Sequence, residues 1–176
     1  MPQIDTPASP RPRNISKLAS LCIFAMLSGS ADAIAEPVAE IPLEAWQDLP
    51  MSPGDWSYAA DAQGSVARFG SSQDAIFMIQ CNFGTNGPSE IYLTRSGQTD
   101  GSPGMTIRTT NGSARFAAEA GRSGGVVAAL APREQMLDNM AFSRGRIMIE
   151  TTGLPALVLP DWPELTRVIE DCRAPA

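Results

Sequence analysis

Four arginines have the type and spacing that would suit the binding of an acidic group: Arg108, Arg115, Arg144 and Arg146. A guanidinium is planar and donates two parallel hydrogen bonds to a carboxylate. Arg108 and Arg115 flank Asn111-Gly112, a dipeptide typical of a two-residue type I′ turn between antiparallel strands. That turn places the two arginines opposite each other, and opposed like charges destabilise a strand pair unless something compensates. A solvated sheet face is the simpler interpretation, since surface charge pairs contribute little. The functional alternative is a site for an acidic partner or small anion.

The Asn111-Gly112 turn also sets the register of the whole hairpin. It places Ile107 opposite Phe116 and Thr109 opposite Ala114. Compensation for the two arginines can come from the nearby Glu119, from splaying of the side chains into water, or from a bound anion.

Arg144 and Arg146 flank Gly145 where a predicted helix ends and a strand begins. Cations near a helix C-terminus stabilise it by ~0.3–1 kcal/mol. Glycine is the expected residue just past a helix end. A structural role therefore accounts for both arginines, and a binding role is the alternative.

Several kinds of catalysis are excluded by composition. The chain has no histidine, so it has no Ser-His-Asp or Cys-His machinery and no His-ligated zinc. The serines at 71, 72 and 143 lack the G-x-S-x-G setting of a nucleophile. Asp100 alone does not make a calcium site in the loop 97–104. We predict no catalytic residue, no metal and no cofactor.

Paired carboxylates remain as an alternative, because glycoside hydrolysis needs two carboxyl groups flanking the scissile bond. The acidic side chains are scattered, however, and nothing in the sequence selects two of them. The candidates are Asp55, Asp61, Asp74, Asp138 and Glu150.

The N-terminus has the composition of a secretory signal peptide over residues 1–35. Arg11, Arg13 and Lys17 precede a short apolar run, Leu18–Leu27, and small residues follow. The apolar run is shorter than the ~20 residues that span a bilayer. We therefore predict export to the periplasm or beyond, with no stable membrane insertion after cleavage.

The mature chain is acidic. Without the signal peptide, 10 of the 13 basic and 17 of the 19 acidic side chains remain, a net charge of −7. Such a domain repels phosphate backbones, so nucleic acid is not a predicted partner.

Cys81 and Cys172 are the two cysteines left after Cys22 departs with the signal peptide. An even number of cysteines in an oxidising compartment indicates a disulfide. Closing a loop of about 90 residues contributes ~4–5 kcal/mol in the chain-entropy model. The alternative is two separate buried thiols.

The mature chain is predicted to be one mainly β domain over residues 55–176, preceded by an extended lead-in over 36–54 with Trp46 as a candidate anchor. Short β-type runs separated by turn residues favour an antiparallel sandwich or barrel. Trp56 and Trp162 are predicted to pack in the core or as helix staples, and the alternative is a sugar cleft lined by them and Trp46. The predicted strands are Asp55–Ala60, Ser65–Phe69, Ala75–Cys81, Glu90–Arg95, Met105–Thr110, Ser113–Ala118, Val126–Leu130, Arg146–Thr151 and Ala156–Leu159.

Two helices are predicted to pack on this sheet. The first spans Pro132–Ala141, because proline suits a first helical position. The second begins after an N-cap at Asp161, with Glu164 as its capping-box partner. Cys172 lies on the apolar face of this helix, so the disulfide would join it to the strand that ends at Cys81.

One set of segments has a familiar layout: Trp56, Phe77–Cys81, Met105–Thr109, Ala141–Arg146 and Arg167–Arg173. This layout resembles a family of small secreted proteins of Gram-negative bacteria, over nearly the whole mature chain. The chain also has an early Trp, a strand ending in Cys, a run of β-strands and a C-terminal helix with a second Cys, in that order. This order is similar to that of VasI-type accessory proteins of type VI secretion, which implies a non-enzymatic envelope role and carries over no functional residue.

The sequence therefore predicts a non-catalytic exported protein that binds an envelope protein or component. A carboxylate-dependent envelope hydrolase is one alternative. An inhibitor of a secreted enzyme is another, because a disulfide-closed β domain is a suitable scaffold.

Overall fold

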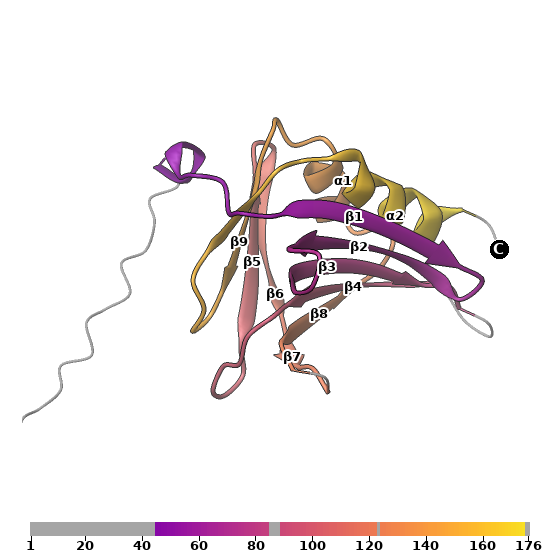
Figure 1. The fold of residues 1–176 in the computed structure, drawn as a ribbon, viewed down its shortest axis with the longest axis horizontal. Helices are drawn as coiled ribbons and strands as arrows, with labels where there is room; N and C mark the ends of the chain where they lie inside the picture. Colours follow the sequence, from indigo (N-terminus) through magenta and orange to yellow (C-terminus); the bar gives the residue numbers. More distant parts are fainter. Residues whose placement is uncertain (1–44, 85–88, 123, 175–176) are drawn as a thin grey trace, which may run out of the picture. The chain divides into compact units, whose positions relative to one another are not determined.

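A computed structural model describes residues 45–84, 89–122 and 124–174 of the chain (Figure 1). The predicted signal peptide and the lead-in before residue 45 lie outside the described residues. Within the described part, no helix combines the length and apolar character needed to cross a bilayer.

The fold is mainly β and consists of two antiparallel sheets with two helices, as predicted. Each predicted strand matches an observed one to within one residue at either end, and only the short β7 was not predicted. The larger sheet has the order β1 (Asp55–Asp61), β2 (Gly64–Gly70), β3 (Ala75–Asn82), β4 (Glu90–Arg95), β8 (Val126–Leu130) and β7 (Glu119–Ala120). The smaller sheet has the order β10 (Leu157–Leu159), β9 (Ile147–Thr151), β5 (Gly104–Thr109) and β6 (Gly112–Ala117).

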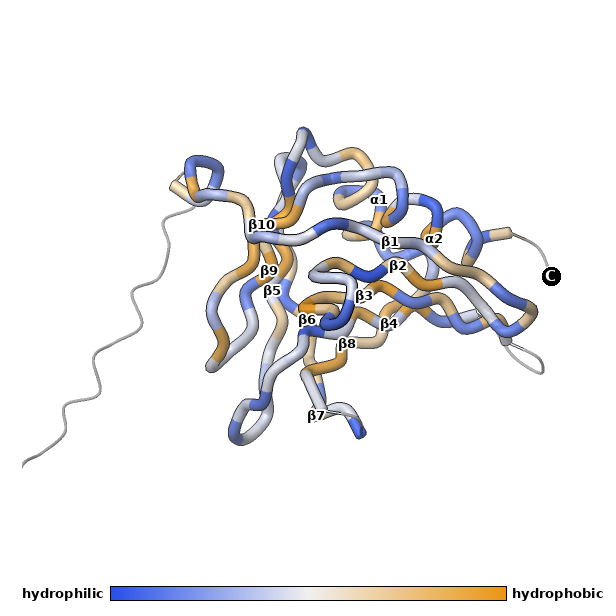
Figure 2. Tube along the Cα trace, in the orientation of Figure 1, coloured by the Kyte–Doolittle hydropathy of each residue, from blue (hydrophilic) through white to orange (hydrophobic). Residues whose placement is uncertain are grey.

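The core lies between the two sheets and the helices α1 (Gln135–Ala141) and α2 (Pro163–Arg173). Side chains alternate along the strands, so Phe77, Ile79 and Cys81 of β3 all point to one buried face. This inner face of the larger sheet packs against α2, which contacts β1 to β4 (Figures 1 and 2). The opposite, outer face carries the more polar residues of the same strands.

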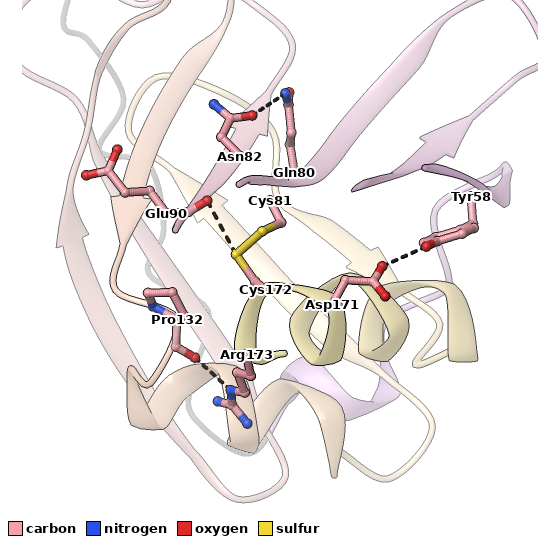
Figure 3. The surroundings of a disulfide bond; sticks show 9 residues. All are labelled: Tyr58, Gln80, Cys81, Asn82, Glu90, Pro132, Asp171, Cys172 and Arg173. Atoms are coloured by element: carbon pink, nitrogen blue, oxygen red, sulfur yellow. Dashed lines mark hydrogen bonds between the residues drawn. A yellow bond between two sulfur atoms is a disulfide. The ribbon is translucent and has the colours of Figure 1, made fainter. Parts of the chain in front are cut away.

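The predicted disulfide between Cys81 and Cys172 is confirmed. It joins β3 to the buried side of α2, with a Cα–Cα distance of 5.5 Å and a sequence separation of 91 residues (Figure 3). Leu165 and Ile169 lie on the same apolar side of the helix. The bond therefore ties the last helix to the middle of the larger sheet.

The predicted register of the β5–β6 hairpin is wrong by one residue on each strand. The turn residues are Thr110 and Asn111, so Arg108 faces Ser113 and not Arg115. Likewise, the predicted pairs of Ile107 with Phe116 and of Thr109 with Ala114 do not form. The observed partners are Ala114 for Ile107, Met105 for Phe116 and Gly112 for Thr109.

Hydrogen bonds to side chains and to a distant loop place the turn. The Thr109 hydroxyl accepts from the Asn111 N–H at 3.1 Å and donates to the Gly112 carbonyl at 3.0 Å. The Asn111 side chain donates to the Phe142 carbonyl at 2.8 Å, and the Thr110 N–H donates to Ser143 Oγ at 3.2 Å. The hydrogen bonds of the Thr109 hydroxyl and these tertiary bonds favour the observed turn over the type I′ turn that Asn-Gly alone would favour.

Both helices begin later than predicted. Residues 132–134 form a turn closed by the Glu134 N–H and the Ala131 carbonyl, and α1 starts at Gln135. The N-cap of α2 is Trp162, not Asp161, and it makes no side-chain capping bond. Pro163 explains this start, because proline disfavours helical backbone in the residue before it and suits the first helical position.

The three tryptophans have different environments. Trp46 lies in a short 3₁₀ helix and is 2% exposed, packed against Met148 and Val158 on the smaller sheet. It therefore anchors the end of the lead-in. Trp56 is buried beside Phe69, whereas Trp162 is 41% exposed and does not lie in the core.

Candidate functional site

The predicted arginine site is divided among separate structural roles. Arg108 forms an ion pair with Glu150 of β9, with Nε–Oε2 at 2.5 Å and side-chain exposures of 17% and 25%. The carboxylate that compensates the arginine therefore comes from β9, not from Glu119. Because its charge is already paired, Arg108 needs no bound anion.

Arg115 shares a sheet face with Arg108 and lies opposite Thr106. Its guanidinium covers Gly104, where an added Cβ would come within 2.4 Å of Nη2. Nη2 also lies 3.5 Å from Thr152 Oγ1. This side chain thus lies flat on the sheet and packs over β5.

Arg144 and Arg146 make different contacts. Arg146 donates to the backbone carbonyls of Gln47 and Leu49, the latter at 3.0 Å, and so fastens the end of the lead-in. Arg144 is exposed, and its backbone N–H donates to Thr110 Oγ1 at 2.9 Å. The structure places Arg144 at the turn of the β5–β6 hairpin, where it contributes to the observed register.

A polar hollow of about 260 Å³ lies on the larger sheet, at the β1–β2 turn and across to β3. It was not predicted from the sequence. Strand pairing alone assembles it, since Val66 lies opposite Gln80 and Gly64 lies opposite Asn82. The hollow is lined by Ala59, Ala60, Asp61, Gln63, Gly64, Ser65, Val66, Arg68, Gln80 and Asn82.

The polar groups of the hollow are held in place by local bonds. Gln80 Nε2 donates to Asn82 Oδ1 at 2.7 Å (Figure 3). Asp61 Oδ1 accepts from the backbone N–H groups of Gln63 at 2.8 Å and Gly64 at 3.1 Å. Gly64 is needed here, because a Cβ would meet the Cys81 carbonyl oxygen at 2.0 Å. The hollow is therefore preorganised.

The chemistry of the hollow is that of hydrogen bonding. The hydrogen bond between Gln80 and Asn82 leaves the Gln80 side-chain carbonyl and the Asn82 amide hydrogens unused. A matching ligand would donate a hydrogen bond to Gln80 and accept one from Asn82. Asp61 is the one carboxylate among the lining residues and Arg68 the one cation. A single turn-bound carboxylate does not supply the acid and base pair of a glycosidase.

Asp161 has an unusual environment that the sequence did not reveal. Burial at the start of α2 raises the pKa of its carboxyl to about 6. Glu164, one turn further, has a buried Oε2 without a hydrogen-bond partner. The predicted capping box would have bonded both side chains to backbone N–H groups at the start of α2. Because the capping box does not form, both carboxyl groups lie at the start of the helix without these bonds.

Arg95 is a buried cation that no pattern in the sequence indicates. It is 9% exposed and donates to the carbonyls of Ile76, Ser96 and Pro155. Burial lowers the pKa of its guanidinium. These bonds link β3 and β4 to the segment before β10, so the role of Arg95 is structural.

Comparison with known proteins identifies no relatives: no family model, no curated protein and no solved structure matches this chain. The resemblance to small secreted Gram-negative proteins therefore stays a prediction. Across residues 45–84, 89–122 and 124–174, no three His, Cys, Asp or Glu side chains are grouped to hold a metal ion.

Proposed function

We propose that the mature chain is an exported, non-catalytic protein that binds another protein or component of the bacterial envelope. The hollow at the β1–β2 turn is the proposed recognition site. The observation that carries this proposal is the set of fixed polar groups in it, above all the Gln80–Asn82 amide pair.

The composition of the hollow favours binding over turnover. Amide side chains and one guanidinium recognise hydroxyl, amide and carboxylate groups without changing them. Hydrogen bonds within the hollow hold Gln80, Asn82 and Asp61 before a ligand arrives. This preorganisation lowers the entropy cost of association. A volume of about 260 Å³ is small, so the hollow would hold one residue or one sugar of a larger partner.

Export is part of the proposal and is supported by two independent features. The N-terminal residues have the pattern of a signal peptide. The Cys81–Cys172 bond belongs to an oxidising compartment, because cytosolic thiols are kept reduced.

An in-cell crosslink tests the proposal. Tagged mature protein is crosslinked in the envelope, and captured bands are identified by mass spectrometry. We expect one reproducible partner for the wild type and reduced capture for Gln80→Ala/Asn82→Ala, because both side chains are exposed and their loss spares the core. Gln73→Ala removes an exposed amide outside the hollow and is the matched control.

Two results would count against the proposal. Equal capture by the hollow variant and the Gln73 control would remove the hollow as the site. No reproducible partner for the wild type would remove the binding function itself.

A carboxylate-dependent hydrolase is the second candidate, and Asp161 is the observation that favours it. A carboxyl whose pKa is raised to about 6 suits a general acid. Release of soluble fragments from purified cell-wall glycan by the wild type, abolished in Asp161→Asn, would support this function. No release by the wild type would exclude it for that substrate.

A further inference from the structure

The edge of the larger sheet at β1 has a row of backbone groups without a partner strand among the described residues (Figure 1). Asp61 and Gly64 flank a two-residue turn, so the bonds to β2 fall on Asp61 and on every second residue before it. The intervening Trp56, Tyr58 and Ala60 direct their N–H and C=O groups to the open edge. Such an edge is a template for another strand.

Between its two terminal aspartates, β1 lacks the devices that usually protect an edge strand. Its seven residues include no proline and no lysine or arginine, and its pairing with β2 is regular over the full length. On its outer face the central side chains are Ser57 and Ala59, both small and exposed. On the outer face, an incoming strand therefore meets neither a charge nor a bulky side chain at the centre of β1.

Acidic residues at both ends of β1 determine which strand fits. Asp55 and Asp61 are exposed and point to the outer face, six residues apart. In an antiparallel pair with a second copy centred on Tyr58, each Asp55 would face the Asp61 of the other copy. Like charges directly opposite destabilise a strand pair, so self-pairing is disfavoured.

The chain's own lead-in is also a poor occupant of this edge. Residues 36–44 carry three glutamates and two prolines. The glutamates would repel the aspartates of β1, and proline cannot donate to a strand ladder.

We propose that β1 accepts an extended segment of a partner protein by strand addition, and that this segment carries basic residues six positions apart. The basic residues would face Asp55 and Asp61. Residues between them would alternate between the outer face, beside the hollow, and the inner face, beside Tyr58 and Arg167. This inference rests on the proposed function and names the chemistry of the partner.

The inner side of this edge suits an apolar side chain. The Tyr58 hydroxyl donates to Asp171 of α2 at 2.6 Å, and the Arg167 guanidinium lies 4.4 Å from the centre of the Tyr58 ring. These contacts hold the ring in place and use its polar atom. The partner residue opposite Tyr58 thus meets a fixed aromatic surface.

Synthetic peptides with blocked ends test the proposal on the disulfide-bonded mature protein. The probe is Arg-Val-Thr-Val-Thr-Val-Arg and its matched control is Glu-Val-Thr-Val-Thr-Val-Glu, compared by fluorescence anisotropy at low salt. We expect the basic peptide to bind at least about tenfold more tightly than the acidic one. Comparable binding of the two peptides, or no binding of either, would overturn the inference.

Protein variants then locate the binding. Asp55→Asn/Asp61→Asn keeps the turn acceptor at Asp61 but removes both charges, and should reduce the preference for the basic peptide to about twofold. Asp74→Asn/Asp100→Asn makes the same change in net charge at exposed loops and should leave the preference for the basic peptide unchanged. Equal effects of the two double variants would show attraction by net charge alone, which overturns the inference.

Ala60→Pro tests strand addition itself, because it removes an N–H from the open edge and spares the bonds to β2. We expect peptide binding to be lost while the far-UV spectrum is kept. Retained binding would contradict strand addition. A wild-type dimer that Ala60→Pro dissociates would instead make a second copy the occupant.

A failure of the edge inference can be distinguished from a failure of the proposed function. If Ala60→Pro and the charge variant capture the same envelope partner as the wild type, the edge inference fails and the proposed function stands. If the wild type captures no partner at all, the proposed function fails.

Discussion

Arg108 on β5 and Glu150 on β9 form a diagonal ion pair, because Arg108 faces Met148 and Glu150 faces Thr106 in the sheet register. The pair crosses two neighbouring strands of the smaller sheet, and both side chains are mostly covered. Arg115 lies on the same face but takes no part in this contact. The pair thus neutralises the positive charge at the centre of this face.

A double-mutant cycle measures this ion pair. We expect Arg108→Ala and Glu150→Ala to couple by about 1 kcal/mol in urea unfolding, since the pair is only partly solvated. Arg115→Ala with Glu150→Ala is the control and should be additive. Additive effects of Arg108 and Glu150 would show that the pair contributes nothing measurable.

The disulfide between β3 and α2 should dominate the stability of the fold. Cys81→Ala/Cys172→Ala frees a loop with a sequence separation of 91 residues, which costs ~4–5 kcal/mol in the chain-entropy model. Urea unfolding of the variant and of the oxidised wild type checks this value. The reduced wild type should resemble the variant, and an unchanged unfolding midpoint would contradict the prediction.

Trp46 should matter far more to stability than Trp162. Trp46→Ala removes a side chain that is 2% exposed and leaves Met148 and Val158 uncovered, at an expected cost of about 3 kcal/mol. Trp162→Ala removes one that is 41% exposed, and the expected change is below ~1 kcal/mol. Thermal unfolding of the two variants compares them, and similar losses would argue against an anchored lead-in.

Asp161 should make stability depend on pH in the weakly acidic range. Its folded-state pKa of about 6 lies above its ordinary value of 3.8, so the folded state favours the protonated form. This contribution is complete below pH 3.8 and is lost as the pH rises through 6. The effect is on the order of 1 kcal/mol, because the half-buried group keeps some solvent.

Asp161→Asn stays neutral at every pH and isolates this effect. It should be more stable than the wild type at pH 7.5 and equal to it at pH 4, as measured by melting temperature. The exposed Asp100→Asn is the control and should show no such dependence. A constant difference between Asp161→Asn and the wild type across this range would sink the idea.

Local patterns in the sequence were enough to predict the strands, because alternation and turn residues act over a few positions. They also placed Cys81 and Cys172 on buried faces, where the structure joins them. Helix starts were less predictable. The capping preference of Asp161 competes with the backbone restriction that Pro163 imposes, and the restriction prevails.

The sequence by itself determined the fold class, the disulfide and the absence of histidine chemistry, since these depend on composition and short-range periodicity. Only the tertiary structure decided the hairpin register, the partner of Arg108 and the hollow. The hydrogen bond from Asn111 to Phe142 and the pairing of Gly64 with Asn82 join residues far apart in the chain. No local pattern contains such contacts, because their geometry exists only once the sheets have paired.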